Sequence, residues 1–146
     1  MKKILRFFLS LFYIGNIKFA PGTIASIFTM CIWFFIPNFL FLQLSIIIIV
    51  VILAFFLCYI FSKYNDAKDP QYIVIDESVG MMISLLMIPN SLPLYFICII
   101  LFRFFDILKP SIISRSENIG NGIGIVADDI VSGILTFIIV FGYISI

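Results

Sequence analysis

Two pairs of adjacent acidic residues are the clearest candidates for chemistry in this sequence. Asp76-Glu77 follows an apolar Tyr-Ile-Val-Ile run, and Asp128-Asp129 follows Gly-Ile-Val-Ala. Clustered carboxylates repel each other unless a proton or cation neutralises them, and hard ions such as Mg²⁺ prefer oxygen ligands. Adjacent helical residues diverge by about 100°, so two pairs on neighbouring helices predict a shared metal site better than one pair does. The alternative is that both pairs are solvated helix caps, which suits the second pair better than the first.

Three further charged residues recur at intervals of three: Arg103, Asp106 and Lys109. On a helix this spacing places them on one side. Arg103 and Lys109 could bind a phosphate group, with Asp106 orienting them or serving as a metal ligand or general base. The alternative is a salt bridge at a helix end, with the cations extending toward water.

Two glycine-containing segments precede expected helices. In Gly120-Asn-Gly-Ile-Gly124, glycine permits close backbone approach and leaves helix amides free for an anion, so Gly122 and Gly124 are second-tier candidates. A flexible connector has the same composition. Pro21-Gly22-Thr23 opens another helix, with Thr23 expected as its N-cap and as a substrate contact, or as a cap alone.

The residues that are absent narrow the chemistry. The chain has no histidine, which excludes Ser-His-Asp hydrolysis and histidine-based phosphatase chemistry. It has no Asp-x-Asp motif for a phosphoaspartate, and no cysteine followed by a glycine-rich loop and arginine. Metal-assisted chemistry on carboxylates remains, with Arg and Lys to hold anions.

The composition indicates a membrane protein. Hydrophobic residues make up 63% of the chain and charged residues only 12%, with a mean hydropathy of +1.24. So few polar groups could not cover a core in water, whereas lipid suits this composition. We therefore expect an all-α polytopic membrane protein, with one membrane-embedded domain over residues 1–146.

Apolar stretches separated by polar breaks predict about five transmembrane or membrane-embedded helices. Their expected ranges are 21–36, 39–63, 70–88, 92–109 and 124–145. The division between the third and fourth rests on Pro89-Asn-Ser-Leu-Pro93, because two prolines favour a turn over one continuous span.

This arrangement puts every charge on one membrane face. The connections on the other face, Pro37-Asn38 and Asn90-Ser91, carry none of the 9 Lys and Arg or the 8 Asp and Glu. The positive-inside rule then places the charged face and the N-terminus in the cytoplasm and the C-terminus outside. Residues 1–20 are expected to form a basic interfacial segment, because Lys18 interrupts the apolar run that a signal peptide needs.

Four motifs together resemble the phosphatidylglycerophosphatase A family. In that family's order they are Pro-Gly-Thr-Ile-Ala-Ser (21–26), Ile-Asp-Glu-Ser-Val-Gly (75–80), Phe-Arg-Phe-Phe-Asp-Ile-Leu-Lys-Pro (102–110) and Gly-Ile-Gly-Ile-Val-Ala-Asp-Asp-Ile-Val-Ser-Gly (122–133). The resemblance implies a Mg²⁺-dependent enzyme of the bacterial inner membrane. Such an enzyme removes the terminal phosphate of phosphatidylglycerophosphate to give phosphatidylglycerol in phospholipid biosynthesis.

The chain departs from the family pattern at a few positions. Glycine is usual where Ala25 and Asn121 stand, proline is frequent at Ile112, and aspartate at Glu117. These changes concern backbone fit more than the paired acids. Asp69 matches an acidic position of the pattern and is a second-tier candidate.

The combined expectation is a lipid phosphatase at the cytoplasmic membrane surface. Asp76, Glu77, Asp128 and Asp129 are expected to hold Mg²⁺ and activate water, while Arg103 and Lys109 bind the phosphomonoester. The expected partners are the membrane and a phospholipid substrate, not nucleic acid, and a homo-oligomer is left open.

Two other functions are weighed against this one. A phosphatidyltransferase would need an acid-rich signature with Asp-Gly and Ala-Arg at set positions, which the chain lacks. A small carboxylate-lined cation channel or carrier would need acids at mid-membrane depth, whereas here they are expected near one face.

Overall fold

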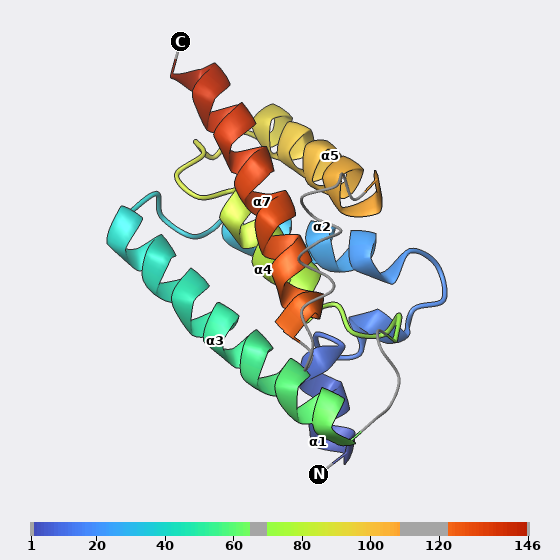
Figure 1. Ribbon diagram of the computed structural model, residues 1–146. Coiled ribbons are helices and arrows are strands. Elements are labelled where there is room, and N and C mark those ends of the chain that lie inside the picture. The colour runs from blue at the N-terminus through green and yellow to red at the C-terminus, as the bar shows by residue number, and fades with distance from the viewer. Residues whose placement is uncertain (1, 65–69, 109–122, 146) are drawn as a thin grey trace.

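The described part of the chain, residues 2–64, 70–108 and 123–145, is all-helical in the computed structural model (Figure 1). Its elements are α1 (Lys2–Leu9), the 3₁₀ helix η1 (Ile14–Asn16), α2 (Pro21–Trp33), α3 (Leu40–Tyr64), α4 (Ile75–Ser84), α5 (Leu92–Leu108) and α7 (Ile123–Ile144). The N- and C-termini lie at opposite ends of the bundle (Figure 1).

Two of these helices, α3 and α7, are long and apolar enough to cross a membrane. The exposed face of α3 carries large apolar side chains, among them Ile49, Ile52 and Phe56. A helix that is apolar around its whole circumference belongs in lipid or in a core, and α3 is mostly uncovered by protein. These features support membrane association, and the expected five spans stay a prediction.

The third expected helix, over 70–88, is wrong in length, because α4 has only 10 residues. Pro70 begins a turn that the Ile73 N–H closes on its carbonyl at 2.9 Å. The N–H of Val74 then donates to the carbonyl of Leu9, also at 2.9 Å, so this backbone bonds to the end of α1 instead of continuing a helix. The other expected ranges agree with α2, α3, α5 and α7 to within a few residues.

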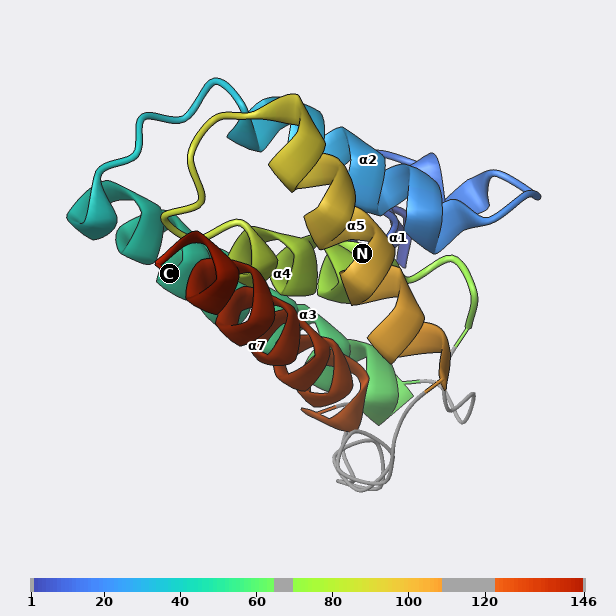
Figure 2. The ribbon, with the colours of Figure 1, turned by 90° about the horizontal axis from the view of Figure 1, so that it is seen from above.

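Helix α4 lies at the centre of the bundle, in contact with α2, α3, α5 and α7 (Figures 1 and 2). Its closest neighbour is α7, because glycines face each other where the two helices meet. A methyl group added at Gly133 would overlap the carbonyl oxygen of Gly80. The close approach fixes α7 against α4 and brings the acids of both helices to one place.

Two apolar clusters cover α4 along its length. One contains Trp33, Leu85 and Phe102, all fully buried. The other contains Leu9 and Val126 and lies toward the N-terminal end of α4. Packing of this kind holds the first turn of α4 rigidly against its neighbours.

Candidate active site

The first turn of α4 carries Asp76 and Glu77. Asp76 is only 6% exposed, and its Oδ1 accepts a hydrogen bond from the Glu77 N–H at 3.1 Å. From the sequence, this pair was expected inside a longer helix, where a helix-cap role suits it less well than it suits Asp128-Asp129. The later start of α4 corrects this: both acids lie at a helix N-terminus, where the helix dipole favours negative charge.

The second acidic pair lies in the second turn of α7, because that helix begins at Ile123. Asp128 and Asp129 are 6% and 3% exposed. Buried residues beyond the first turn are not solvated caps, so that explanation is wrong for this pair. The buried Oδ1 of Asp129 has no hydrogen-bond partner among the described residues.

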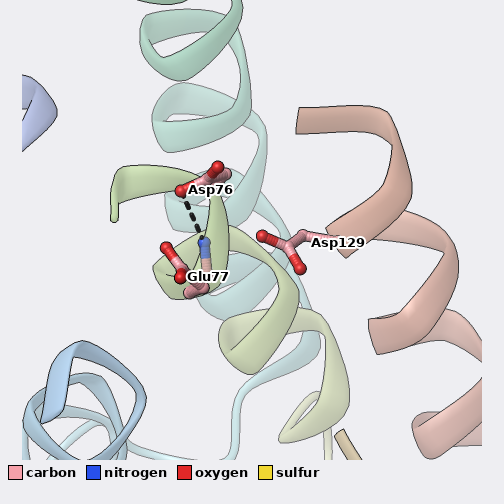
Figure 3. Close-up of side chains that lie close together, drawn as sticks. All are labelled: Asp76, Glu77 and Asp129. Carbon is pink, nitrogen blue, oxygen red and sulfur yellow. Dashed lines mark hydrogen bonds between the residues drawn. The ribbon is translucent and has the colours of Figure 1, made fainter. Parts of the chain in front are cut away.

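Asp76, Glu77 and Asp129 form a carboxylate cluster. One oxygen from each lies within 4.8 Å of the other two. Figure 3 shows Asp129 extending from α7 toward the two acids of α4. Both acids of the α4 pair thus reach the same place, although adjacent helical positions diverge by about 100°.

Burial and mutual repulsion make this cluster costly without a counterion. Burial raises the pKa of Asp76 well above its usual range, and the carboxylates of Glu77 and Asp129 raise it further. Burial also raises the pKa of Glu77, against the lowering effects of its hydrogen bond with Asp76 and of the Arg103 charge. A bound cation relieves both effects at once.

The donor set fits a hard divalent cation such as Mg²⁺. All three ligand groups are carboxylates, which Mg²⁺ prefers over nitrogen and sulfur ligands. Within the described residues, Glu77 Oε2 and Asp129 Oδ1 are buried without a hydrogen bond. Unsatisfied buried oxygens on two members of one cluster are the arrangement that an ion would complete.

Arg103 lies beside the cluster, on α5. Its Nη1 is 2.6 Å from Asp106 Oδ2 and 3.9 Å from Glu77 Oε1. The predicted side-by-side placement of Arg103 and Asp106 is thus confirmed. Within the described part of the chain, Arg103 Nε is buried without a hydrogen-bond partner, so this donor remains available to an anion.

The acids and the arginine share one cavity of about 400 Å³. This volume is typical of small-molecule sites. Its charged and amide lining residues are Lys18, Gln71, Asp76, Glu77, Arg103, Asp106, Asp128 and Asp129. Backbone and apolar surface comes from Ala20, Pro21, Gly22, Ile73 and Ile125. We call this space the acidic cavity.

Two other predicted site residues, Thr23 and Gly124, do not line the acidic cavity. The N-cap of α2 is Ala20, so the N-cap role expected of Thr23 is wrong, and Thr23 does not line the acidic cavity. Gly124 is buried in the first turn of α7 and also lies outside the lining. Lys109, Asp69 and Gly122 fall outside the described residues.

Two polar residues that line the cavity, Lys18 and Gln71, were not predicted as site residues from the sequence. Lys18 was interpreted only as a break in the N-terminal apolar run. Its position just before Pro21-Gly22 could have signalled a role, because that motif was already a candidate. Gln71 carried no comparable signal.

The fold and site define a helical, membrane-associated protein with a carboxylate cluster and an ion-paired arginine in one cavity. Comparison with known proteins identifies the family. The phosphatidylglycerophosphatase A family model matches residues 7–144, and the chain belongs to this family. The chain is accordingly an enzyme, a phosphoric monoester hydrolase of the phosphatidylglycerophosphatase type.

Three relatives illustrate the range of the family. Phosphatidylglycerophosphatase A of Haemophilus influenzae is 38% identical over 133 residues, covering 87% of this chain and 80% of its own. The Escherichia coli protein of the same name is 31% identical, covering 84% of this chain and 73% of its own. A Bacteroides thetaiotaomicron protein, provisionally named phosphatidylinositol-3-phosphatase, is 34% identical, covering 86% of this chain and 84% of its own. No solved structure matches the chain.

Proposed function

We propose that this chain hydrolyses the terminal phosphate of phosphatidylglycerophosphate in a Mg²⁺-dependent reaction that supplies phosphatidylglycerol to phospholipid biosynthesis. The main support is that Asp76, Glu77 and Asp129 lie together beside Arg103 in one cavity. Family membership supports the reaction type.

The carboxylate cluster would hold the metal. Asp76, Glu77 and Asp129 are the proposed ligands, and Asp128 is a further ligand or a proton acceptor, because it lines the cavity outside the cluster. When bound, Mg²⁺ polarises the phosphoryl group and lowers the pKa of a coordinated water.

Arg103 would bind the phosphomonoester. Its Nε, which has no partner among the described residues, can donate to a non-bridging phosphate oxygen. The ion pair with Asp106 holds the guanidinium in place, so we assign Asp106 an orienting role in preference to that of general base. Lys109, the second expected cation, stays a prediction.

The reaction exchanges one P–O bond for another. The oxygen of water bonds to phosphorus, and the bond from phosphorus to the glycerol oxygen breaks. A cavity carboxylate accepts the proton from water, and the leaving alkoxide takes up a proton. The products are phosphatidylglycerol and inorganic phosphate.

The acidic cavity would face the cytoplasm at the bacterial inner membrane. Arg6 and Lys63 belong to α1 and the last turn of α3, which lie together near the N-terminus (Figure 1), and Lys18 lines the acidic cavity itself. The positive-inside rule assigns such an end to the cytoplasm. The acyl chains would then stay in the bilayer while the headgroup enters the cavity.

Arg103 also argues against a cation channel or carrier. A guanidinium within 3.9 Å of a cluster acid repels a passing cation, whereas it stabilises a bound phosphate. The described acids Asp76, Glu77, Asp106, Asp128 and Asp129 also meet in one cavity and do not form a path along the helices.

Phosphate release from phosphatidylglycerophosphate by the purified protein in detergent micelles tests the proposal. Release should require Mg²⁺, stop with EDTA and return when Mg²⁺ is restored. Asp76→Asn should lower kcat by at least about 100-fold, with thermal unfolding as the folding control. Full turnover by a folded Asp76→Asn variant, or release that ignores the chelator, would contradict the proposal.

A further inference from the structure

A second cavity, of about 330 Å³, adjoins the acidic cavity. The two share Lys18, Pro21 and Gln71 as lining residues. On its other side the second cavity is lined by Arg6, Asn16 and Tyr72. The two cavities are therefore neighbours, with Lys18 exposed to both.

The second cavity has the opposite charge character. It contains Arg6 and Lys18 but no carboxylate. Within the described part of the chain, neither cation lies within 4.0 Å of a carboxylate, the limit for an ion pair. Both ion pairs found there involve Arg103. We call this space the cationic cavity.

Arg6 is held in a fixed position by neutral groups. Its Nη2 donates to Asn16 Oδ1 at 2.7 Å, and its guanidinium lies 4.8 Å from the centre of the Tyr72 ring. These contacts orient the side chain without neutralising its charge. An arginine oriented in this way loses little conformational freedom when it binds an anion.

The backbone around Asn16 and Lys18 is also constrained. Leu11, Phe12 and Tyr13 have φ values of 46°, 57° and 69°, a left-handed conformation that is uncommon for residues other than glycine. Gly15 is packed so closely that an added methyl group would overlap the carbonyl of Tyr72. Strained conformations of this kind persist where the surrounding structure fixes them, and they are frequent at ligand sites.

We propose that the cationic cavity binds the phosphodiester of the substrate while the terminal phosphomonoester lies in the acidic cavity. The inference rests on the proposed function and specifies what the site recognises. In phosphatidylglycerophosphate one glycerol carries both groups, so binding the diester places the monoester at a set distance from it. Arg6 and Lys18 are positioning residues for specificity, and the carboxylate cluster acts on the other phosphate.

The proposal makes the enzyme selective for lipids that carry both kinds of phosphate. Phosphatidate has a monoester directly on its diacylglycerol and no diester, so it cannot fill the cationic cavity. Phosphatidylinositol 3-phosphate has both groups and can fill both cavities, at a different separation. The presence and position of the diester thus distinguish these headgroups, even though the hydrolysed bond is a phosphomonoester in each of them.

The test compares phosphatidylglycerophosphate with phosphatidate of the same acyl chains, in micelles of neutral detergent with Mg²⁺ and no other anionic lipid. Lys18→Met should raise KM for phosphatidylglycerophosphate about tenfold and lower the kcat/KM preference over phosphatidate by a similar factor. Arg6→Gln should act in the same direction. Lys18→Arg should restore most of the preference.

Lys63→Met is the matched control, because Lys63 is an exposed cation of α3 that lines neither cavity. It should leave the preference unchanged. Two inhibitors show whether the cationic cavity binds a lipid diester or free phosphate. Phosphatidylglycerol, a diester, should inhibit Lys18→Met more weakly than the wild type, whereas inorganic phosphate should inhibit both alike.

Equal losses on both substrates in Lys18→Met, an unchanged preference, or a matching loss in Lys63→Met would each overturn the inference. Its failure is distinguishable from failure of the proposed function. A wild-type protein that hydrolyses both lipids with Mg²⁺ but shows no preference overturns the diester site alone. A wild-type protein that releases no phosphate from phosphatidylglycerophosphate overturns the function.

Discussion

Replacing Gly22 with alanine should disable the acidic cavity while leaving the fold intact. Gly22 is buried in the first turn of α2, and the methyl group of alanine would overlap Glu77 Oε1. It would also lie 2.9 Å from Glu77 Cδ and 3.1 Å from Arg103 Nη1. The added group therefore acts directly on one proposed metal ligand and on the proposed phosphate-binding arginine.

The size of the effect follows from these distances. Ordinary van der Waals contact begins at 3.4 Å, so Glu77 Cδ must retreat by about 0.5 Å and its carboxylate oxygen by more. A displacement approaching 1 Å at a reacting centre costs up to about 100-fold, so we expect kcat/KM to fall by about 10- to 100-fold. The free energy of unfolding should change by less than about 1 kcal/mol, because the Glu77 side chain is flexible and alanine favours a helix over glycine.

The assay measures phosphate release against Mg²⁺ concentration. A displaced ligand should raise the Mg²⁺ concentration for half-maximal activity by about tenfold or more. Gly142→Ala is the matched control, because a methyl group at Gly142 in α7 would meet nothing within 4 Å. That variant should keep the wild-type activity and Mg²⁺ dependence.

A second substitution makes the test stricter. Glu77→Asp shortens the side chain, so in the Gly22→Ala background it should relieve the overlap. The double variant should then lose less activity than the two single losses multiplied together. Wild-type kcat/KM and Mg²⁺ dependence in a folded Gly22→Ala protein would refute the described position of Glu77 and its role as a ligand.

Three further predictions follow from the same geometry. Asp129→Asn should lower kcat at least about 100-fold and raise the Mg²⁺ concentration needed for half-maximal phosphate release. An unaltered Mg²⁺ titration would exclude Asp129 as a ligand. Arg103→Lys keeps the charge but loses the planar fork of donors, so KM should rise about tenfold, and an unchanged KM would mean that a point charge suffices. Gly133→Ala should lower the free energy of unfolding by about 1–3 kcal/mol, because its methyl group overlaps the Gly80 carbonyl, and thermal unfolding against Gly142→Ala measures this.

Local spacing predicted the features of the site that depend on single helices. Arg103 and Asp106 are three residues apart, and a helix brings such residues together whatever its tertiary context. The chemistry of the paired acids also followed from their types, because carboxylates in an apolar chain need a counterion.

The parts that could not be predicted depend on contacts between distant segments. Helix α4 begins at Ile75 because Val74 bonds to Leu9, a pairing that the periodicity of residues 70–88 does not encode. Which of two adjacent acids joins the cluster depends on how α7 is rotated against α4, and the contact between Gly80 and Gly133 sets that rotation. Lys18 lines the cavity from a segment that follows a left-handed turn at residues 11–13, and none of these three residues is a glycine that would have indicated the turn.

The shortness of α4 is what allows one site to attract both a cation and a phosphate. A helix that began at residue 70 would have placed Asp76 and Glu77 in its second turn, with their amides bonded inside the helix. In a helix that begins at Ile75, the same residues contribute carboxylates to the cluster from the first turn, where the Glu77 N–H donates to Asp76 Oδ1 and not to a helix carbonyl. The carboxylates favour a divalent ion, and the helix N-terminus favours the anion that the ion would bind. The turn at Pro70 and the hydrogen bond between Val74 and Leu9 prevent α4 from beginning earlier in the chain. They are therefore as necessary for the site as the acids are.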